Sequence, residues 1–282
     1  MKRYTGVFEI GTQEIKQVGG NMQILIINLP SAKARLSFQQ RQCQSLSLNY
    51  EILKAVSITD VSEKTYQAHA QDWQRPLRKS EVACYFSHRD AWKKVIEYDK
   101  PILIVEDDAL FSKNLPQLLS TLENHSNIDF INLEVRGRKK IISNFGESIN
   151  CNSNLFRLYQ DRTGAAGYIL WPSGAYKLLN HEKNSGIALA DAHITSCPNL
   201  IAYQIEPAPL IQLDQCEHYN IIAPLETESH ISTHQKPVIP QKNLLFKVRR
   251  FFAQVKMGLR QAKVSYKSKK RYITINPKDF NI

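Results

Sequence analysis

The chain has 282 residues, of which 43% are hydrophobic and 22% charged, a composition typical of globular proteins. At about 150 residues per domain, this length allows one large domain or two modest ones. The composition excludes intrinsic disorder, collagen and coiled coil for the whole chain, and no apolar run approaches the roughly 18 residues of a membrane span. The five cysteines are widely spaced and include no CxxC pair. That pattern is typical of a cytoplasmic protein and argues against a thiolate zinc site.

The net charge of +11 comes from one region of the chain. Residues 242–271 hold eleven Lys and Arg and no Asp or Glu, and removing these eleven from the 37 bases leaves 26, equal to the 26 acids. The rest of the chain is therefore neutral overall. We expect no nucleic acid among the partners on the ground of bulk charge.

Three regions are expected along the chain. Residues 1–21 have no clear periodicity and no apolar core of a secretory signal, so they are expected to form an N-terminal extension. One hypothesis makes Met22 the native start, and the alternative is a short mobile extension. Residues 22–228 are expected to form the folded domain, and residues 229–282 a basic tail.

The folded domain alternates strands and helices. In chain order, the apolar patterns predict a strand at 23–29, a helix at 31–46, a strand at 50–57, a loop at 59–78, a helix at 81–98, a strand at 102–105, a helix at 114–124, a strand at 129–134, a strand at 168–171 and a helix at 173–179. Ser31 and Ser80 are expected to cap the first two helices. This order predicts an α/β sandwich around a mostly parallel sheet.

The strongest chemical feature is a run of three acids, Glu106, Asp107 and Asp108, directly after an apolar strand. Ligands of open α/β sheets collect at the carboxyl ends of strands. Adjacent carboxylates repel one another unless a cation joins them, and their oxygens suit Mg²⁺ or Mn²⁺, which often bridges to a diphosphate. The alternative is a solvated acidic turn.

The glycines restrict which diphosphate ligand this is. No glycine occurs between Gly20 and Gly137, which excludes a P-loop or a dinucleotide fingerprint in the first half of the chain. The cluster from Gly164 to Gly167 does not match the fingerprint either. Diphosphate binding through a metal, without a glycine loop, indicates a nucleotide-sugar enzyme.

Several segments resemble glycosyltransferase family 25, the lipooligosaccharide galactosyltransferase type. The specific part is SEVACYFSHRDAW at 80–92, which matches E-x-x-C-x-x-S-H-x-x-x-W, followed after a short gap by VEDDAL at 105–110. The supporting matches are the opening strand Ile24–Pro30, TGAAGYILWPSGAYKLL at 163–179 and ADAHI at 190–194. The resemblance covers roughly residues 22–215.

The resemblance implies a GT-A-like fold, a UDP-galactose donor, Mn²⁺ or Mg²⁺, and inversion at the transferred sugar. It implies a lipooligosaccharide core sugar as acceptor, with a β-1,4 type linkage. It also implies a cytoplasmic enzyme at the inner face of the bacterial inner membrane. Two alternatives stay open: an inert membrane- or nucleic-acid-binding protein on the same fold, and a metal-dependent phosphohydrolase.

The resemblance also implies roles for individual residues at the acidic run. Asp108 is expected to bind the metal, with Glu106 as a further ligand or a contact to the donor, and Asp107 is expected to point the other way, onto the sugar or into the turn. His193 is a third candidate metal ligand, although a lone histidine is more often structural. The other expected donor contacts are Asn28, Leu29, Ser87 and His88.

Inversion needs a base that takes a proton from the acceptor hydroxyl, and a carboxylate of raised pKa suits this role. Asp191, in the matched ADAHI segment, is the first candidate, and a helix cap or a metal ligand is an equally good interpretation. Glu134 is the second candidate. A surface acid in a turn with Arg136 is the favoured interpretation of that residue.

The basic tail contains an amphipathic stretch at 243–259. Its apolar residues fall within about a third of the helical circle, and bases occupy much of the rest. This arrangement is typical of a helix at an anionic membrane surface, where each base adds about 1 kcal/mol. The alternative is a helix that packs on the catalytic domain. The apolar residues are Leu244, Leu245, Val248, Phe251, Phe252, Val255 and Leu259.

Overall fold

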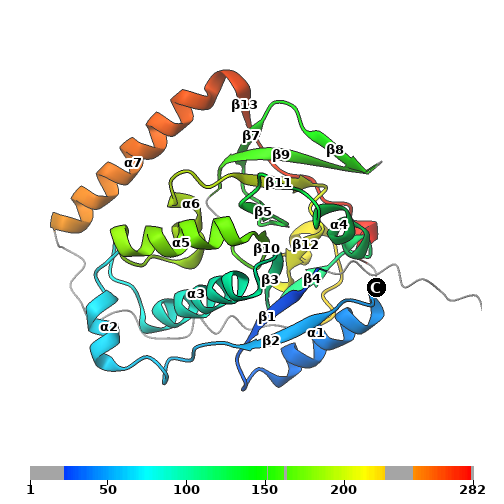
Figure 1. Cartoon of the computed structure of the whole chain (residues 1–282), viewed down its shortest axis with the longest axis horizontal. Coiled ribbons are helices and arrows are strands. Elements are labelled where there is room, and N and C mark those ends of the chain that lie inside the picture. Colours follow the sequence, from blue (N-terminus) through cyan, green and yellow to red (C-terminus); the bar gives the residue numbers. More distant parts are fainter. Residues whose placement is uncertain (1–21, 151, 162–163, 226–243, 281–282) are drawn as a thin grey trace, which may run out of the picture.

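The computed structural model describes residues 22–150, 152–161, 164–225 and 244–280 (Figure 1). The expected N-terminal extension and the expected boundary between residues 228 and 229 lie outside the described residues.

One large sheet runs through the molecule, in the order β13-β7-β9-β11-β5-β10-β3-β1-β2, with β8 beside β9. Its strands are β1 (Ile24–Asn28), β2 (Tyr50–Lys54), β3 (Ile102–Glu106), β5 (Phe130–Asn132), β7 (Lys140–Ser143), β8 (Glu147–Asn150), β9 (Ser153–Gln160), β10 (Gly167–Leu170), β11 (Ala202–Glu206) and β13 (Ser268–Arg271). A small second sheet has the order β4-β12-β6, formed by β4 (Ala109–Phe111), β12 (Leu210–Gln212) and β6 (Glu134–Val135).

The α/β class is confirmed, and the large sheet is mixed. The pairs β1–β2, β1–β3 and β5–β11 are parallel. The pairs made by β10 with its two neighbours, and those among β7, β8, β9, β11 and β13, are antiparallel. The connections from β7 through β8 to β9 are short, and short connections can join only antiparallel strands. The expected parallel pairing is therefore found among β2, β1 and β3 and between β5 and β11.

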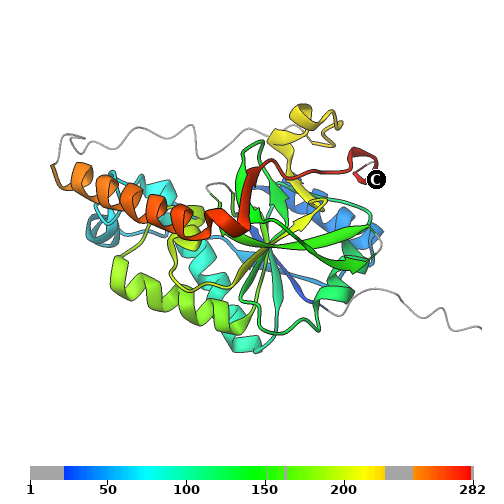
Figure 2. The same ribbon diagram turned by 90° about the horizontal axis from the view of Figure 1, so that it is seen from above.

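Helices cover both faces of the sheet (Figures 1 and 2). Strand β3 explains why, because its alternate residues face opposite sides. Ile102 and Ile104 belong to the core on one side, whereas Leu103 and Val105 belong to the core on the other. The helices are α1 (Lys33–Ser45), α2 (Glu63–His69), α3 (Lys79–Tyr98), α4 (Leu115–Leu122), α5 (Pro172–Ser185), α6 (Ala190–Ser196) and α7 (Leu244–Val264). Single-turn 3₁₀ helices occur at Leu213–Gln215, Glu217–Tyr219, Ser265–Lys267 and Pro277–Asp279.

Two predicted caps and one predicted loop are wrong. Helix α1 begins after Ala32 and helix α3 after Arg78, so neither Ser31 nor Ser80 is the cap residue. At α3 the carboxylate of Glu81 accepts the backbone N–H of Arg78 at 2.8 Å, which fixes the start two residues earlier than expected. The predicted loop at 59–78 contains α2, whose cap is Ser62.

The basic region contains α7, which lies along the outside of the molecule between α2 and the β13 end of the sheet (Figures 1 and 2). In the part of the chain that the structure describes, no helix combines the length and the apolar character needed to cross a bilayer.

Candidate active site at the carboxyl end of β3

The three acids lie where β3 turns into β4, and they face two sides. The Gln212 amide nitrogen, Nε2, lies 3.4 Å from Oε2 of Glu106 and 3.3 Å from Oδ1 of Asp108. Both carboxylates therefore meet the same amide. Asp107 points the other way, where its Oδ2 accepts a hydrogen bond from Asn28 at 2.7 Å and its Oδ1 pairs with Arg35 at 3.1 Å. This geometry matches the prediction that Glu106 and Asp108 face one side and Asp107 faces the other.

The two facing carboxylates differ in their pKa values. Burial, together with the negative charge of Glu106, raises the pKa of Asp108 from its ordinary value of 3.8 to about 7. Burial also acts to raise the pKa of Glu106, but the hydrogen bond from His88, together with the positive charges of Arg136 and Arg35, outweighs it and leaves that pKa below its usual range. The pair therefore holds one anion securely, and the second negative charge is unfavourable unless a cation is present.

His88 holds Glu106 in place. Its Nε2 lies 3.1 Å from Oε1 of Glu106, and its Nδ1 lies 2.9 Å from the hydroxyl of Tyr168. That hydroxyl accepts the indole N–H of Trp92 at 2.9 Å, so its own proton is available for Nδ1. This order leaves the proton of the imidazole on Nε2, where it is donated to Glu106. A line of hydrogen bonds thus runs from the helix layer to the carboxylate.

Ser87 and His88 were expected to reach the donor, and their contacts differ from that expectation. Both side chains are buried. The hydroxyl of Ser87 donates to the carbonyl of Ala83 at 3.0 Å and accepts the N–H of Val56 at 2.9 Å, which joins α3 to the segment after β2. His88 is 1% exposed and contacts Glu106 rather than an open surface. Both side chains therefore contact the protein framework of the site, and direct contact with the donor stays a prediction.

Asn28 and Leu29, also expected at the donor, belong to the framework as well. The amide of Asn28 is buried and donates to Asp107 and, at 3.4 Å, to the carbonyl of Ala32. Leu29 is partly buried and packs on the core. The end of β1 thus fixes the orientation of Asp107, and direct donor contact by Asn28 and Leu29 stays a prediction.

The favoured interpretation of Glu134 as a surface acid is wrong. Glu134 is 1% exposed, and neither of its carboxylate oxygens has a hydrogen-bond partner among the described residues. Burial holds the pKa of this carboxyl well above its usual range. Arg136, its expected partner, instead contacts Gln212 and, at 2.6 Å, Asp214. A buried carboxyl without a partner is rare in folded proteins and is a typical sign of a functional group.

Gly164 gives Glu134 its space. The glycine has a φ of +75°, and a Cβ atom at this position would lie 1.6 Å from Oε1 of Glu134. Only glycine fits there, because the backbone is left-handed and the carboxylate occupies the side-chain volume. The glycine-rich segment of the sequence therefore makes room for an acid.

A buried lysine contacts the backbone of Glu134. Lys140, in the basic segment 136–140, is 1% exposed and pairs with Asp161 at 2.7 Å. Its ammonium also donates to the side chain of Gln204 at 2.6 Å and to the backbone carbonyl of Glu134 at 2.9 Å. The sequence pattern gave no signal for this network, because its members come from four separated segments.

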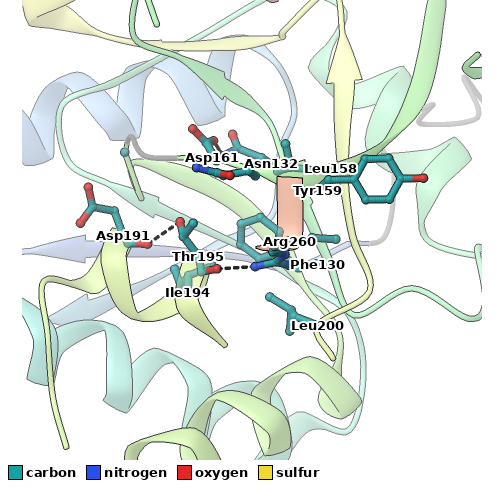
Figure 3. Close-up of a pocket in the computed structure, with 13 residues that line it drawn as sticks. Phe130, Asn132, Leu158, Tyr159, Asp161, Asp191, Ile194, Thr195, Leu200 and Arg260 are labelled. Atoms are coloured by element: carbon teal, nitrogen blue, oxygen red, sulfur yellow. Dashed lines mark hydrogen bonds between the residues drawn. The ribbon is translucent and has the colours of Figure 1, made fainter. Parts of the chain in front are cut away.

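Asp191 lines a narrow crevice together with Asn132, Asp161, Gly164 and Arg260 (Figure 3). The carboxylate of Asp191 points away from Asn132 and Asp161 in this view. Burial, and further the negative charge of Glu106, raise its pKa above the usual range, although the N–H of Ala192 donates to its Oδ1 at 2.7 Å. The crevice holds about 30 Å³, room for about two water molecules.

His193 is not brought to the acids. Its Nε2 lies 3.1 Å from the carbonyl of Leu178 and 3.3 Å from the hydroxyl of Tyr85, and its ring stacks on Trp92. Burial lowers its pKa to about 4. Its neighbours are the helices α3 and α5, so the contacts favour the structural interpretation over the metal ligand.

Two sets of groups could hold a metal ion at this site. Cys84, His88 and Glu106 each offer one ligand atom, and these atoms lie within 4.8 Å of one another. Burial and nearby carboxylates raise the pKa of the Cys84 thiol well above its usual value, which disfavours the thiolate that a metal needs. Glu106 and Asp108 offer carboxylate oxygens only, and hard cations such as Mg²⁺ and Mn²⁺ prefer oxygen. The second set fits the expected cation better.

Comparisons with known proteins identify a family for the chain. The model of a family described as glycosyltransferase family 25 (LPS biosynthesis protein) matches residues 21–194. A Haemophilus influenzae protein provisionally named a glycosyltransferase is 25% identical over 170 residues, which are 58% of this chain and 59% of that protein. Procollagen galactosyltransferase 1-A of Xenopus laevis is 29% identical over 176 residues, which are 57% of this chain and 28% of that protein.

The chain thus spans less than two thirds of these relatives' own lengths. Among solved structures, a glycosyltransferase involved in the glycosylation of the major capsid of PBCV-1 aligns with 71% of this chain and 99% of its own, at 10% identity and a TM-score of 0.39.

Proposed function

The chain belongs to glycosyltransferase family 25, and from that membership we propose that it transfers galactose from UDP-galactose to a sugar of a lipooligosaccharide core. The observation that carries this proposal is the pair of facing carboxylates, Glu106 and Asp108, at the carboxyl end of β3. Galactose is supported by a galactosyltransferase among the relatives, at low identity. The acceptor is supported by the description of the family.

The carboxylate pair fits a divalent cation. Asp108 has its pKa raised to about 7 by burial and by Glu106, so an adjacent positive charge would relieve the repulsion. The ligand atoms are oxygens, as Mg²⁺ and Mn²⁺ require. When bound, such an ion supplies Lewis-acid neutralisation of the diphosphate leaving group. The line of hydrogen bonds through His88 would keep Glu106 ionised and oriented for this role.

The proposed reaction inverts the transferred sugar, which requires a base on the acceptor side. We assign this base to Asp191, because it is partly exposed, lines the crevice and has a raised pKa. Glu134 is sealed at 1% exposure, and its high pKa favours the protonated form. A neutral carboxylic acid donates a hydrogen bond, so Glu134 would act as a buried hydrogen-bond donor rather than remove a proton.

Donor turnover tests the proposal. The protein is incubated with UDP-galactose, Mn²⁺ and a truncated lipooligosaccharide, and UDP release is measured with and without a chelator. We expect release that needs both acceptor and metal, with a product whose anomeric configuration, read by NMR, is opposite to that of the donor. Release of UMP or phosphate without acceptor would identify a phosphohydrolase instead. Binding of UDP-galactose without turnover on any truncated acceptor would contradict the proposed acceptor class.

Two substitutions test the assignment of the base. Asp191→Asn should lower kcat at least about 100-fold, within the range typical of a lost general base, and leave UDP-galactose binding intact. Glu134→Gln keeps a hydrogen-bond donor and should retain most of kcat. If Glu134→Gln abolishes turnover while Asp191→Asn retains it, the assignment is wrong and the two roles exchange.

A further inference from the structure

Helix α7 has two opposite faces, and the inner one packs on the protein. Phe246 and Val264 are buried, and Ala253, Met257 and Arg260 are partly buried. The intervals between these five residues are 7, 4, 3 and 4, so they lie on one side of a helix that turns about 100° per residue. This side forms the contact between α7 and the rest of the molecule.

Polar contacts fix the orientation of the helix near both of its ends. Near its start, Arg249 donates to the carbonyl of Trp73 at 3.2 Å and also contacts the carbonyl of Gln71. Near its end, Arg260 donates to the carbonyl of Thr195 at 3.0 Å. The amide of Gln261 donates to the side-chain oxygen of Gln160 at 2.8 Å. The outer face of α7 therefore has a defined direction relative to the active site.

The outer face is an apolar stripe in contact with solvent. At about 100° per residue, its members centre on the side of the helix opposite Phe246 and Val264. Helix α7 does pack on the protein, as the alternative expected, but through its inner face and not through these apolar residues. The members of the apolar stripe, with exposures from 40% to 73%, are Leu244, Leu245, Val248, Phe251, Phe252, Val255 and Leu259.

Positive charges border the apolar stripe on both sides. The helical angles place Arg249, Lys256 and Lys263 along one border, and Lys247 along the other. No acidic residue occurs from residue 242 to residue 271. An apolar stripe with bases at both borders matches the interface of an anionic bilayer, which offers acyl chains below and phosphate groups at the sides.

We propose that the apolar stripe of α7 docks the protein onto the surface of an anionic lipid bilayer. The helix lies parallel to the membrane, with Phe251 and Phe252 inserted at the boundary between headgroups and acyl chains. A second copy of the chain fits this face less well. Packing two stripes together would bring the bases of both copies against one another, with no acid on α7 to pair with them.

The geometry connects this surface to the active site. Arg260, on the inner face of α7, lines the same crevice as Asp191. A helix is about 10 Å across with its side chains, so docking would hold the crevice about one helix diameter above the membrane plane. Together with the proposed function, this placement fits an acceptor whose sugars are attached to a membrane-embedded lipid.

Vesicle co-sedimentation of the full chain tests the proposal. The vesicles are either phosphatidylcholine alone or phosphatidylcholine with phosphatidylglycerol. We expect binding to the anionic vesicles that weakens with added salt, because salt screens exposed charges. Phe251→Ser combined with Phe252→Ser should lower the partition coefficient at least about tenfold, because each ring removes apolar area from water. Lys247→Glu with Lys256→Glu should lower binding to anionic vesicles by a similar factor.

Matched controls separate docking from loss of folding. Tyr176→Ser removes an aromatic ring that is 61% exposed on α5, and Lys33→Glu reverses an exposed charge on α1; both should bind vesicles as the wild type does. The proposal is overturned if the wild type does not bind vesicles, or if the Phe251 and Phe252 substitutions leave binding unchanged. It is also overturned if the wild type is a dimer that does not bind vesicles and that these substitutions convert to monomers.

Turnover on a water-soluble truncated acceptor distinguishes this proposal from the proposed function. The Phe251 and Phe252 substitutions should leave that turnover unchanged, because neither side chain touches the site. Transfer without vesicle binding overturns only the docking surface. Vesicle binding without transfer overturns only the proposed enzyme.

Discussion

Asp108→Asn should make the metal-free protein more stable while removing its metal site. The wild-type carboxyl has its pKa raised from 3.8 to about 7. A carboxyl whose pKa is raised on folding costs nothing below its unfolded pKa, and the cost grows until the pH passes the folded pKa. At about 1.36 kcal/mol for each tenfold step, the full difference corresponds to about 4 kcal/mol. Asp108 is partly exposed, so solvent screening should reduce this to about 2 kcal/mol.

The uncharged amide avoids this cost. We expect Asp108→Asn to be more stable than the wild type by about 1 kcal/mol at pH 5 and about 2 kcal/mol at pH 8. In thermal unfolding with a chelator, the larger value corresponds to an increase in Tm of about 4–8 °C. Added Mn²⁺ should then stabilise the wild type, by about 2.7 kcal/mol at 100 times the Kd, and leave the variant unchanged.

Asp90→Asn is the matched control, because Asp90 is an acid on the exposed side of α3, paired only with Lys93 among the described contacts. It should change neither the pH dependence of Tm nor the response to Mn²⁺. The reasoning is refuted if Asp108→Asn is less stable than the wild type at pH 8, or if it keeps the full response to Mn²⁺.

Three further substitutions test the framework. Tyr168→Phe leaves an indole N–H and an imidazole nitrogen unpaired, so it should destabilise the fold by about 1–3 kcal/mol in urea unfolding and lower kcat more than it raises KM; an unchanged kcat would contradict the positioning role. Lys140→Met leaves Asp161 buried without its cation and should cost about 3–5 kcal/mol, whereas a neutral effect would show that the pair is dispensable. Gly164→Ala forces a side chain against Glu134 and should cost at least about 1–3 kcal/mol, a prediction that wild-type stability of the variant would contradict.

The strands nearest the site were predictable from sequence because their signals are local. Runs of apolar residues fixed β1 and β3, and a strand end followed by acids fixed the place of Glu106 and Asp108. The orientation of Asp107 away from Glu106 and Asp108 was expected from the family resemblance, and it agrees with the alternation of side chains along an extended backbone. Helix α2 was missed because it is short, polar and without buried residues, so no apolar period marks it.

The surroundings of the acids depend on contacts between distant segments, which no local pattern encodes. Gln212 meets the acids from a strand about a hundred positions later in the chain. Lys140 is buried because Asp161, about twenty positions later and directly after the neighbouring strand β9, pairs with its ammonium. Glu134 looked like a surface acid for the same reason: the glycine that encloses it lies thirty residues away.

Metal-dependent binding of UDP tests the central claim most directly, because it needs neither an acceptor nor turnover. Isothermal titration of UDP into the wild type should give binding with Mn²⁺ and at least about tenfold weaker binding with a chelator. Asp108→Asn should bind UDP equally weakly under both conditions, and Asp90→Asn should behave as the wild type. Equal affinity of the wild type with and without Mn²⁺, or metal-dependent binding that survives Asp108→Asn, would contradict a nucleotide-sugar site built on these two carboxylates.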